Sequence, residues 1–375
     1  MSYGAQWNGR QAQTAYVLAG LSLVFLLLAQ SLARRPPAVA EEMRRAAVLM
    51  RDATEAVCRC REARRIPIDP ASDINRTGFI GLEASPITTS LGNLEAKRTT
   101  VNPNFAGLLV LLLHEAGVRK GETVAIGASS SFPALITAAL SAARVLELQP
   151  LLICSLGASQ WGANHPDFCW LDIQDCLNDS GVLAIAPIAL SLGGEGDAGL
   201  DMSPEGRVLL ARRAAAMGLP FLTESSLERN VAERMRLYGE AAGNGPIAAF
   251  INIGGGYANM GTDSEILKVG PGLAAFGAIP PAERRGVIFE MAARRVPVIH
   301  LLYIKGLCDR FRLSWDPEPL PPPGEGEVFR ARYFSRPLLA FIAGTYFAFV
   351  ASVLLAARRR SRKDPWNGAA VTSRW

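Results

Sequence analysis

Two uncharged apolar segments, one near each end of the chain, constrain its fold more than any other feature. They cover residues 14–33 and 337–357, and neither contains Asp, Glu, Lys or Arg. A helix rises about 1.5 Å per residue, so about 20 residues cross a hydrocarbon core about 30 Å thick. We therefore expect a transmembrane helix at each end. The first segment also has features of a cleaved signal peptide, with Ser31-Leu32-Ala33 as the cleavage site.

Basic residues beside the spans predict the orientation in the membrane. Five of them lie between residues 358 and 363, and Arg and Lys next to a span tend to remain in the cytoplasm. Two spans place both termini, residues 1–13 and 358–375, on the same side. We therefore expect a two-pass protein of the cell membrane whose globular domain lies outside the cytoplasm. Arg10 before the first span, with Arg34 and Arg35 after it, favours the opposite orientation.

The composition fits a globular domain tethered to a membrane. Of the 375 residues, 49% are hydrophobic and 19% are charged, and about 300 lie between the two spans. That length is sufficient for a substantial core. The formal net charge is +5, and residues 358–363 alone hold five basic residues. Because the excess positive charge is local to the membrane, we predict membrane lipid, and no nucleic acid, as a partner.

The segments that flank the domain have compositions of their own. Residues 34–77 form a juxtamembrane segment, in which residues 38–65 mix charged and apolar positions without Pro or Gly and predict an amphipathic helix. We favour a solvated stalk over a helix that binds a specific partner. Residues 316–336 are rich in Pro and Gly and predict a linker into the second span. The globular domain is then residues 78–315.

Apolar runs alternate with helical patterns throughout this domain. The runs predict strands at residues 124–126, 151–155, 183–192, 221–222, 247–253 and 296–302. Helical patterns cover residues 133–146, 204–217, 227–242 and 281–295. Continuous apolar strands between helices are typical of a parallel sheet covered on both faces. We therefore predict an α/β fold with a mostly parallel, doubly wound, Rossmann-like sheet.

Glycine- and serine-rich loops follow five of the predicted strands. In a parallel sheet such loops meet at the carboxyl edge, where open α/β folds bind ligands. The predicted ligand-binding residues are Ser130, Gly157, Ser159, Asn164, Gly193, Gly194, Gly254, Gly255, Gly256 and Asn259, together with Arg98. No loop matches G-x-G-x-x-G or a P-loop, so nucleotide binding has no support and the cofactor is left open.

The turn at residues 127–131 carries three consecutive serines between a predicted strand and a predicted helix. It is similar to a nucleophile elbow, which makes Ser129 and Ser131 candidate nucleophiles. A serine nucleophile needs a base, and His300 or a desolvated Lys97 could serve as one. The alternative, which we favour, is that these serines cap the following helix or bind an anion.

Other chemistry-bearing residues give weaker signals. Acidic loop residues such as Asp197 could hold a hard cation, but their spacing is not diagnostic, and we predict no metal site. Among the six cysteines, Cys169 and Cys176 could form a disulfide if the domain faces an oxidising compartment. Sequence spacing leaves the connectivity open.

Several uninterrupted strings between residues 78 and 310 resemble the bacterial poly-γ-glutamate system protein family. They include SPITTSLGNLEAKRT at 85–99, SSSFPAL at 129–135, GASQWGAN at 157–164, LDMSPEGR at 200–207 and NIGGG at 252–256. Shorter matches lie at 102–105 and 191–194. The resemblance implies a place in the synthesis or export of an anionic cell-surface polymer, with membrane subunits of that machinery as partners. It supplies no catalytic residues.

The resemblance and the loops together give three interpretations of function. We expect a membrane-anchored accessory protein that binds poly-γ-glutamate, or a glutamyl intermediate, at the loop edge. One alternative is a serine-dependent amide hydrolase or transferase that acts on γ-glutamyl chains. The other is a non-catalytic structural subunit of the synthase complex.

Overall fold

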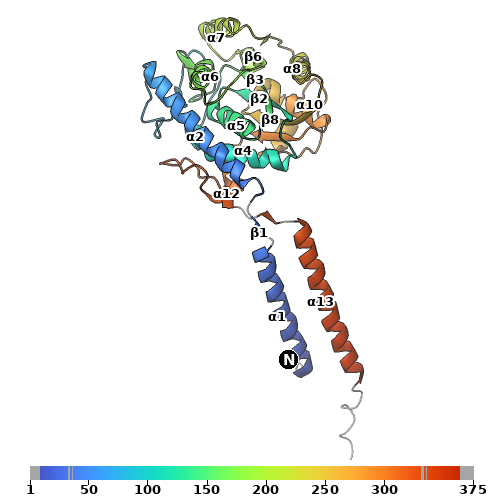
Figure 1. Cartoon of the computed structure of the whole chain (residues 1–375). Helices are drawn as coiled ribbons and strands as arrows, with labels where there is room; N and C mark the ends of the chain where they lie inside the picture. The colour runs from blue at the N-terminus through green and yellow to red at the C-terminus, as the bar shows by residue number, and fades with distance from the viewer. Residues whose placement is uncertain (1–8, 33, 36, 331–332, 335, 364–375) are drawn as a thin grey trace, which may run out of the picture. The chain divides into compact units, whose positions relative to one another are not determined.

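The computed structural model describes residues 9–32, 34–35, 37–330, 333–334 and 336–363. These residues divide into two units (Figure 1). One comprises the described residues of Met1–Ala38 and Ala331–Trp375, and the other is Val39–Arg330. Each unit is described by itself below.

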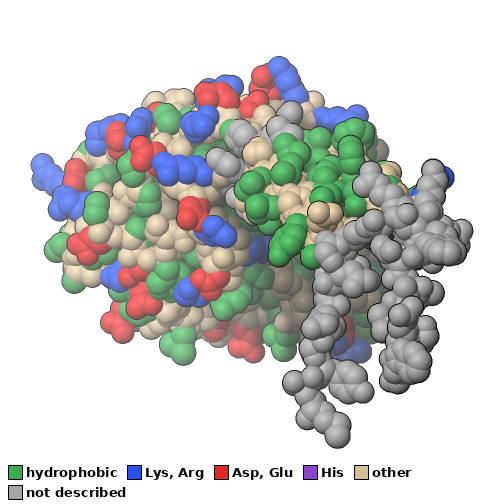
Figure 2. Space-filling model, turned by 90° about the horizontal axis from the view of Figure 1, so that it is seen from below, with side chains coloured by type: hydrophobic (Ala, Val, Ile, Leu, Met, Phe, Trp, Pro, Cys, Tyr) green, Lys and Arg blue, Asp and Glu red, His purple; other side chains and the backbone are tan. Residues whose placement is uncertain are grey.

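The first unit contains both predicted spans. Helix α1 is Gly9–Leu32 and helix α13 is Arg336–Lys363. Within them, Ala12–Ser31 and Leu338–Arg359 are long and apolar enough to cross a membrane, and neither is buried against protein. Exposed apolar side chains on these helices include Val17, Leu27, Phe341 and Phe349. Figure 2 shows a patch of apolar side chains in green, and Lys, Arg, Asp and Glu side chains intermixed elsewhere in the view. This confirms two helices of membrane-spanning character.

Contacts between α1 and α13 involve polar and aromatic side chains. The Ser22 and Tyr346 hydroxyls lie 2.9 Å apart, and the Phe25 and Tyr346 ring centroids are 5.5 Å apart. Beyond the helices, β1 (Arg34–Arg35) pairs with β11 (Tyr333–Phe334) in an antiparallel ladder. Lipid tails cannot form hydrogen bonds, so the two hydroxyls satisfy each other's hydrogen-bonding capacity across the helix pair.

The second unit is built on a seven-stranded sheet with the order β7-β6-β3-β2-β8-β10-β9. Its strands are β2 Thr123–Ser129, β3 Gln149–Ser155, β6 Ala189–Ser191, β7 Phe221–Leu222, β8 Ile247–Ile253, β9 Gly272–Leu273 and β10 Val298–Leu301. All neighbours pair in parallel except β9 with β10. The α/β class and the mostly parallel sheet are therefore as predicted. The strand predicted over 183–192 is shorter because Pro187 precedes it.

Successive side chains along each strand alternate between two hydrophobic clusters, one on each face of the sheet. Ile126 and Leu152 belong to the first cluster, whereas Ala125 and Ile153 belong to the second. The helices on the first face are α4 Asn104–Glu115, α5 Pro133–Val145, α6 Trp170–Asp179 and α7 Pro204–Ala216. Those on the second are α8 Leu227–Ala241 and α10 Val287–Ala293. Helix α10 is shorter than the predicted 281–295, because Arg285 bridges to Gly261 and Gly286 is extended.

Helix α2, Ala40–Ala63, is not the solvated stalk that we expected. Its apolar side is fully buried at Met43, Met50 and Val57, and it packs against α4 and α5 (Figure 1). The helix was predicted correctly from its amphipathic pattern, but its apolar stripe completes the core. The globular domain therefore begins at Val39 and includes the segment predicted as juxtamembrane.

The Pro-rich segment from 316 is also part of this unit rather than a free linker. Arg98 on α3 (Leu94–Thr100) forms an ion pair with Asp316 through two nitrogens. Asn104 Nδ2 donates to the Glu325 carbonyl at 2.8 Å. Phe329, on α12 (Glu327–Arg330), is buried, and a Cβ at Gly107 would lie 2.7 Å from its ring. These contacts hold the segment on the domain as far as Arg330.

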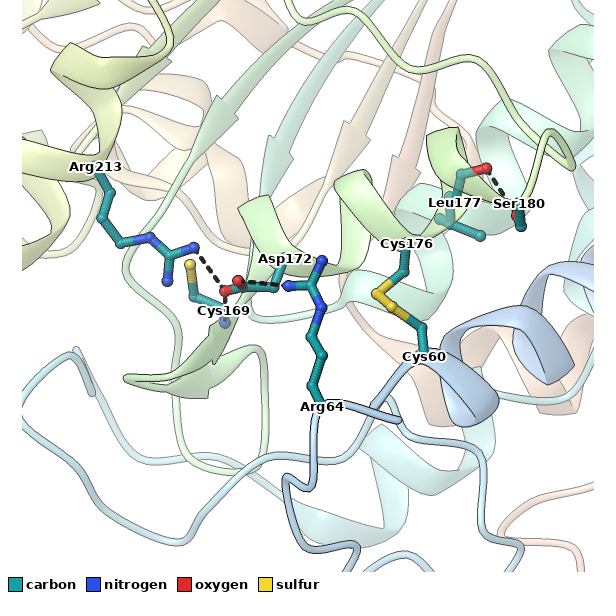
Figure 3. The surroundings of a disulfide bond; sticks show 8 residues. All are labelled: Cys60, Arg64, Cys169, Asp172, Cys176, Leu177, Ser180 and Arg213. Carbon is teal, nitrogen blue, oxygen red and sulfur yellow. Dashed lines mark hydrogen bonds and ion pairs between the residues drawn. A yellow bond between two sulfur atoms is a disulfide. The ribbon is translucent and has the colours of Figure 1, made fainter. Parts of the chain in front are cut away.

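A disulfide joins Cys60 on α2 to Cys176 on α6, 116 residues apart (Figure 3). The predicted pairing of Cys169 with Cys176 is wrong, because Cys169 is a buried free thiol. Beside the disulfide, Asp172 accepts from Arg64 at 2.9 Å and from Arg213 at 2.8 Å. The bridge and the Arg64 ion pair fasten the C-terminal end of α2 to α6, and the Arg213 ion pair joins α7 to the same helix.

Candidate functional site

Polar side chains occupy the carboxyl ends of five adjacent strands on the second face. Cα pairs align Ser191 with Ser155, Ser155 with Ser129, and Asn252 with both Gly127 and His300. On each of these strands, a residue two or four positions earlier belongs to the second hydrophobic cluster. Because side chains alternate along a strand, these polar side chains lie on the same face of the sheet. We name this set the polar row: Ser191, Ser155, Ser129, Asn252 and His300. All are buried, so each needs a hydrogen-bond partner.

The serine turn connects β2 to α5 and is internally hydrogen-bonded. Ser129 Oγ donates to Ser131 Oγ at 2.9 Å and accepts from Ser131 N at 3.2 Å. Ser159 N donates to Ser131 Oγ at 2.9 Å. Ser131 Oγ thus accepts two protein hydrogen bonds, and no group in the described residues accepts its own proton. That hydroxyl is arranged to donate to a ligand oxygen.

Lys97 lies directly behind this turn. Its ammonium donates to the Ser131 carbonyl and to Ser159 Oγ, the latter at 2.7 Å, and sits 3.8 Å from the Phe132 ring centroid. Lys97 is 3% exposed, and no carboxylate in the described part of the chain forms an ion pair with it. Burial lowers the pKa of Lys97 to about 7. Lys97 therefore titrates near neutral pH, beside two serine groups.

The order of the strands reverses between β2 and β8. The chain runs outward from β2 through β3, β6 and β7, then returns to place β8 on the other side of β2. Ser129 and Gly254 meet across this point: a Cβ at Gly254 would lie 3.1 Å from Ser129 Cβ. In open α/β sheets, the crevice at such a reversal is where ligands bind.

Two buried amide oxygens lie beside the same strand pair. Asn252 Oδ1 and Asn259 Oδ1 have no hydrogen-bond partner among the described residues. Asn259 is on the short helix α9 (Tyr257–Met260), and its amide lies so close to β2 that a Cβ at Gly127 would be 2.6 Å from Nδ2. This explains a glycine inside the central strand. Each unpaired oxygen costs about 1–3 kcal/mol unless a ligand or water donates to it.

His300 is not positioned as the predicted base for the serine turn. Its Nδ1 lies 3.0 Å from Asn252 Nδ2, which also donates to the Gly254 carbonyl at 2.8 Å. Burial lowers the pKa of His300 to about 4, so the ring is neutral at physiological pH. No hydrogen bond from His300 to Ser129 or Ser131 is present in the described residues. The base candidate that contacts the serines is Lys97.

A buried ion pair at the other end of the polar row was missed by sequence reasoning. Arg234 on α8 donates to Asp197 at 2.6 Å and to Ser191 Oγ at 3.1 Å. Ser191 Oγ and Asn230 Nδ2 also donate to Asp197, at 2.8 and 3.0 Å. The Asp197 carboxylate, which we considered as a ligand for a cation, is therefore bound by Arg234 instead. Within the described residues, no group of three His, Cys, Asp or Glu side chains is arranged to hold a metal.

The other predicted ligand residues fall into two groups. Gly193, Gly255 and Gly256 lie in loops of the carboxyl edge; a Cβ at Gly193 would be 2.7 Å from Ser155 Cβ. The residues of the second group have structural partners instead. Ser130 Oγ donates to the Ser155 carbonyl, Gly157 N donates to the Leu192 carbonyl, and the Asn164 side chain bonds the backbone of Leu82. Gly194 packs against Asp201, and Arg98 forms its ion pair with Asp316.

No protein-family model, curated protein or solved structure matches the chain. The fold and the site define its class. It is an α/β protein with a mostly parallel seven-stranded sheet, a polar carboxyl edge, and two helices long and apolar enough to cross a membrane.

Proposed function

We propose that this chain is a membrane-anchored component of poly-γ-glutamate synthesis or export that binds the polymer, or a glutamyl intermediate, at the β2–β8 edge. The observation that carries the proposal is the convergence of Ser129, Ser131 and the Gly254 loop where the strand order reverses. The same reversal supports a doubly wound, Rossmann-like sheet. The pathway comes from the sequence resemblance, and membrane subunits of that machinery are the proposed partners.

The chemistry of the edge complements a γ-glutamyl chain. Such a chain carries carboxylates, which accept hydrogen bonds, and backbone amides, which donate them. The Ser131 hydroxyl has a proton available for a carboxylate or carbonyl oxygen. The unpaired Asn252 and Asn259 oxygens would accept from amide N–H groups. A ligand without acceptor oxygens would leave the Ser131 proton unused, and a ligand without N–H groups would leave both amide oxygens unpaired.

A binding measurement with loop variants tests the proposal. The full-length protein in detergent is titrated with a labelled poly-γ-glutamate oligomer, with poly-α-glutamate as a competitor of equal charge. Gly255→Phe adds bulk to the loop, where a Cβ would meet only Leu302, at 3.6 Å or more. Gly277→Phe is the matched control at an exposed glycine with nothing within 4 Å.

We expect Gly255→Phe to weaken binding at least tenfold and Gly277→Phe to leave it unchanged. Ser131→Ala should retain partial binding, because one net hydrogen bond contributes about 0.5–1.5 kcal/mol. If poly-α-glutamate competes equally well, the protein binds the polymer by nonspecific charge attraction and does not recognise the γ-linkage. A folded wild-type protein that binds no polymer would favour the structural-subunit interpretation.

We also propose that the domain lies outside the cytoplasm. The Cys60–Cys176 disulfide supports this, because structural disulfides persist in oxidising compartments. Leu267 is 86% exposed, so Leu267→Cys in a Cys58→Ser background gives a reporter thiol while the other free cysteines are buried. A membrane-impermeant maleimide should label it in intact cells. Labelling only after permeabilisation would place the domain in the cytoplasm.

A further inference from the structure

We infer that Ser159 and Lys97 form a nucleophile–base pair that cleaves or transfers an amide-linked acyl chain at this edge. Ser159 Oγ lies 2.7 Å from Lys97 Nζ, within the range that a proton transfer requires. The sequence motif drew attention to Ser129 and Ser131, but neither hydroxyl contacts a base in the described residues. The identity of the substrate, a γ-glutamyl amide, rests on the proposed function.

The surroundings of Lys97 suit a base rather than a charged binding group. The side chain is buried and has a ring, a carbonyl and a hydroxyl around it. A buried ammonium without a counter-ion is destabilised relative to the neutral amine. The pKa of about 7 has burial as its only cause, so no neighbouring charge sets it. Near neutral pH, a large fraction of Lys97 can therefore accept a proton.

The Ser159 backbone is held in place from both sides. Thr89 N donates to the Ala158 carbonyl at 2.9 Å, and Gln160 N donates to the Ser90 carbonyl at 3.0 Å. Ser159 N is bonded to Ser131 Oγ, and the residue remains 7% exposed at the carboxyl edge. A nucleophile fixed by its own backbone loses little freedom when it reacts.

The reaction balances with water as the only co-reactant. Ser159 Oγ attacks the amide carbonyl carbon while its proton moves to Lys97 Nζ, and the carbonyl electron pair moves to oxygen. The C–N bond then breaks, and Lys97 returns the proton to the leaving amine, which leaves an ester on Ser159. Water attacks that ester with Lys97 as base and releases the carboxylic acid; an amine in place of water gives transfer. The Ser131 hydroxyl can donate to the carbonyl oxygen.

The test is covalent labelling of the full-length protein with a fluorophosphonate, which reacts with a serine hydroxyl activated by a base. The labelled site is mapped by peptide mass spectrometry. Variants are Ser159→Ala, Lys97→Met and Lys97→Arg, since arginine keeps the charge but cannot accept a proton at these pH values. Ser141→Ala is the control, because Ser141 is a buried serine on α5 outside the site.

We expect labelling at Ser159 in the wild type and in Ser141→Ala, none in Ser159→Ala, and at least a 100-fold slower rate in both Lys97 variants. The labelling rate of the wild type should rise with pH through an inflection near 7. This pH profile tests Lys97 as the base even if the Lys97 variants do not fold. Labelling at Ser129 or Ser131, a flat pH profile, or no labelling of folded protein would overturn the inference. Polymer binding by the wild type is measured in parallel. Folded protein that binds the polymer but is not labelled contradicts only the chemistry, whereas labelled protein that binds no polymer contradicts only the proposed function.

Discussion

The Arg234 guanidinium and the Asp197 carboxylate meet at 2.6 Å, with both side chains only 2% exposed. Removing one partner of such a pair leaves a buried charge, which costs about 3–5 kcal/mol. We therefore expect Asp197→Ala to lower the free energy of unfolding by about that amount, measured by denaturant unfolding in detergent. The exposed Lys305–Asp309 pair offers a control, and Asp309→Ala should have no measurable effect. Equal effects of the two substitutions would contradict the prediction.

Lys97 should make stability depend on pH. Its pKa is about 7 in the folded protein and about 10.4 in an unfolded chain. Between these values the unfolded state binds more protons, so the free energy of unfolding increases as pH rises from about 7 to about 10. Each pKa unit corresponds to about 1.4 kcal/mol. Relative to Lys97→Met, the wild type should therefore gain stability across this window. Parallel pH curves for the two proteins would exclude a depressed lysine pKa.

The docking of α2 can be tested on one helix with two substitutions. Met50 is fully buried, so Met50→Ala should lower the free energy of unfolding by about 2–5 kcal/mol. Val48 is 37% exposed on the same helix, and Val48→Ala should change it by no more than about 0.5 kcal/mol. If both substitutions are harmless, α2 is a separate stalk after all.

The disulfide should contribute to stability through its long loop. We expect Cys60→Ser to lower the free energy of unfolding by about 2–5 kcal/mol, since the bridge closes a segment of 116 residues. Cys58 is a partly buried free thiol two residues away, so Cys58→Ser is the matched control. Reducing agent should reproduce the effect of Cys60→Ser in the wild type and have none in the Cys60→Ser variant.

The sequence predicted those parts of the fold that depend on local pattern. Apolar runs identified the central strands, and the helical pattern over 204–217 identified α7, whose N-cap Ser203 accepts from Gly206 N at 3.1 Å. The amphipathic pattern of α2 was equally clear. Whether its apolar stripe meets solvent, a partner or the core depends on distant helices, and no local pattern contains that information.

The chemistry of the site was harder to predict because its partners are far apart along the chain. Lys97 and Ser159 are separated by 62 residues and meet only after β2 and β3 pair. Arg234 did leave a signal: with Asn230, it occupies the stripe of α8 that otherwise carries Leu227, Val231 and Tyr238. A charged residue on an apolar stripe indicates a buried partner. Cysteine connectivity leaves no comparable trace.

The placement of α12 against α2 and α4 has a mechanical consequence. The chain enters the second unit at Val39 and leaves it at Arg330, and the first and last helices of that unit touch, with Phe329 packed against Gly107 beside the Met43 carbonyl. Tension applied between these two ends therefore loads the junction of three helices first. The parallel strands, and the hydroxyl and amide groups at their carboxyl ends, lie off that load path.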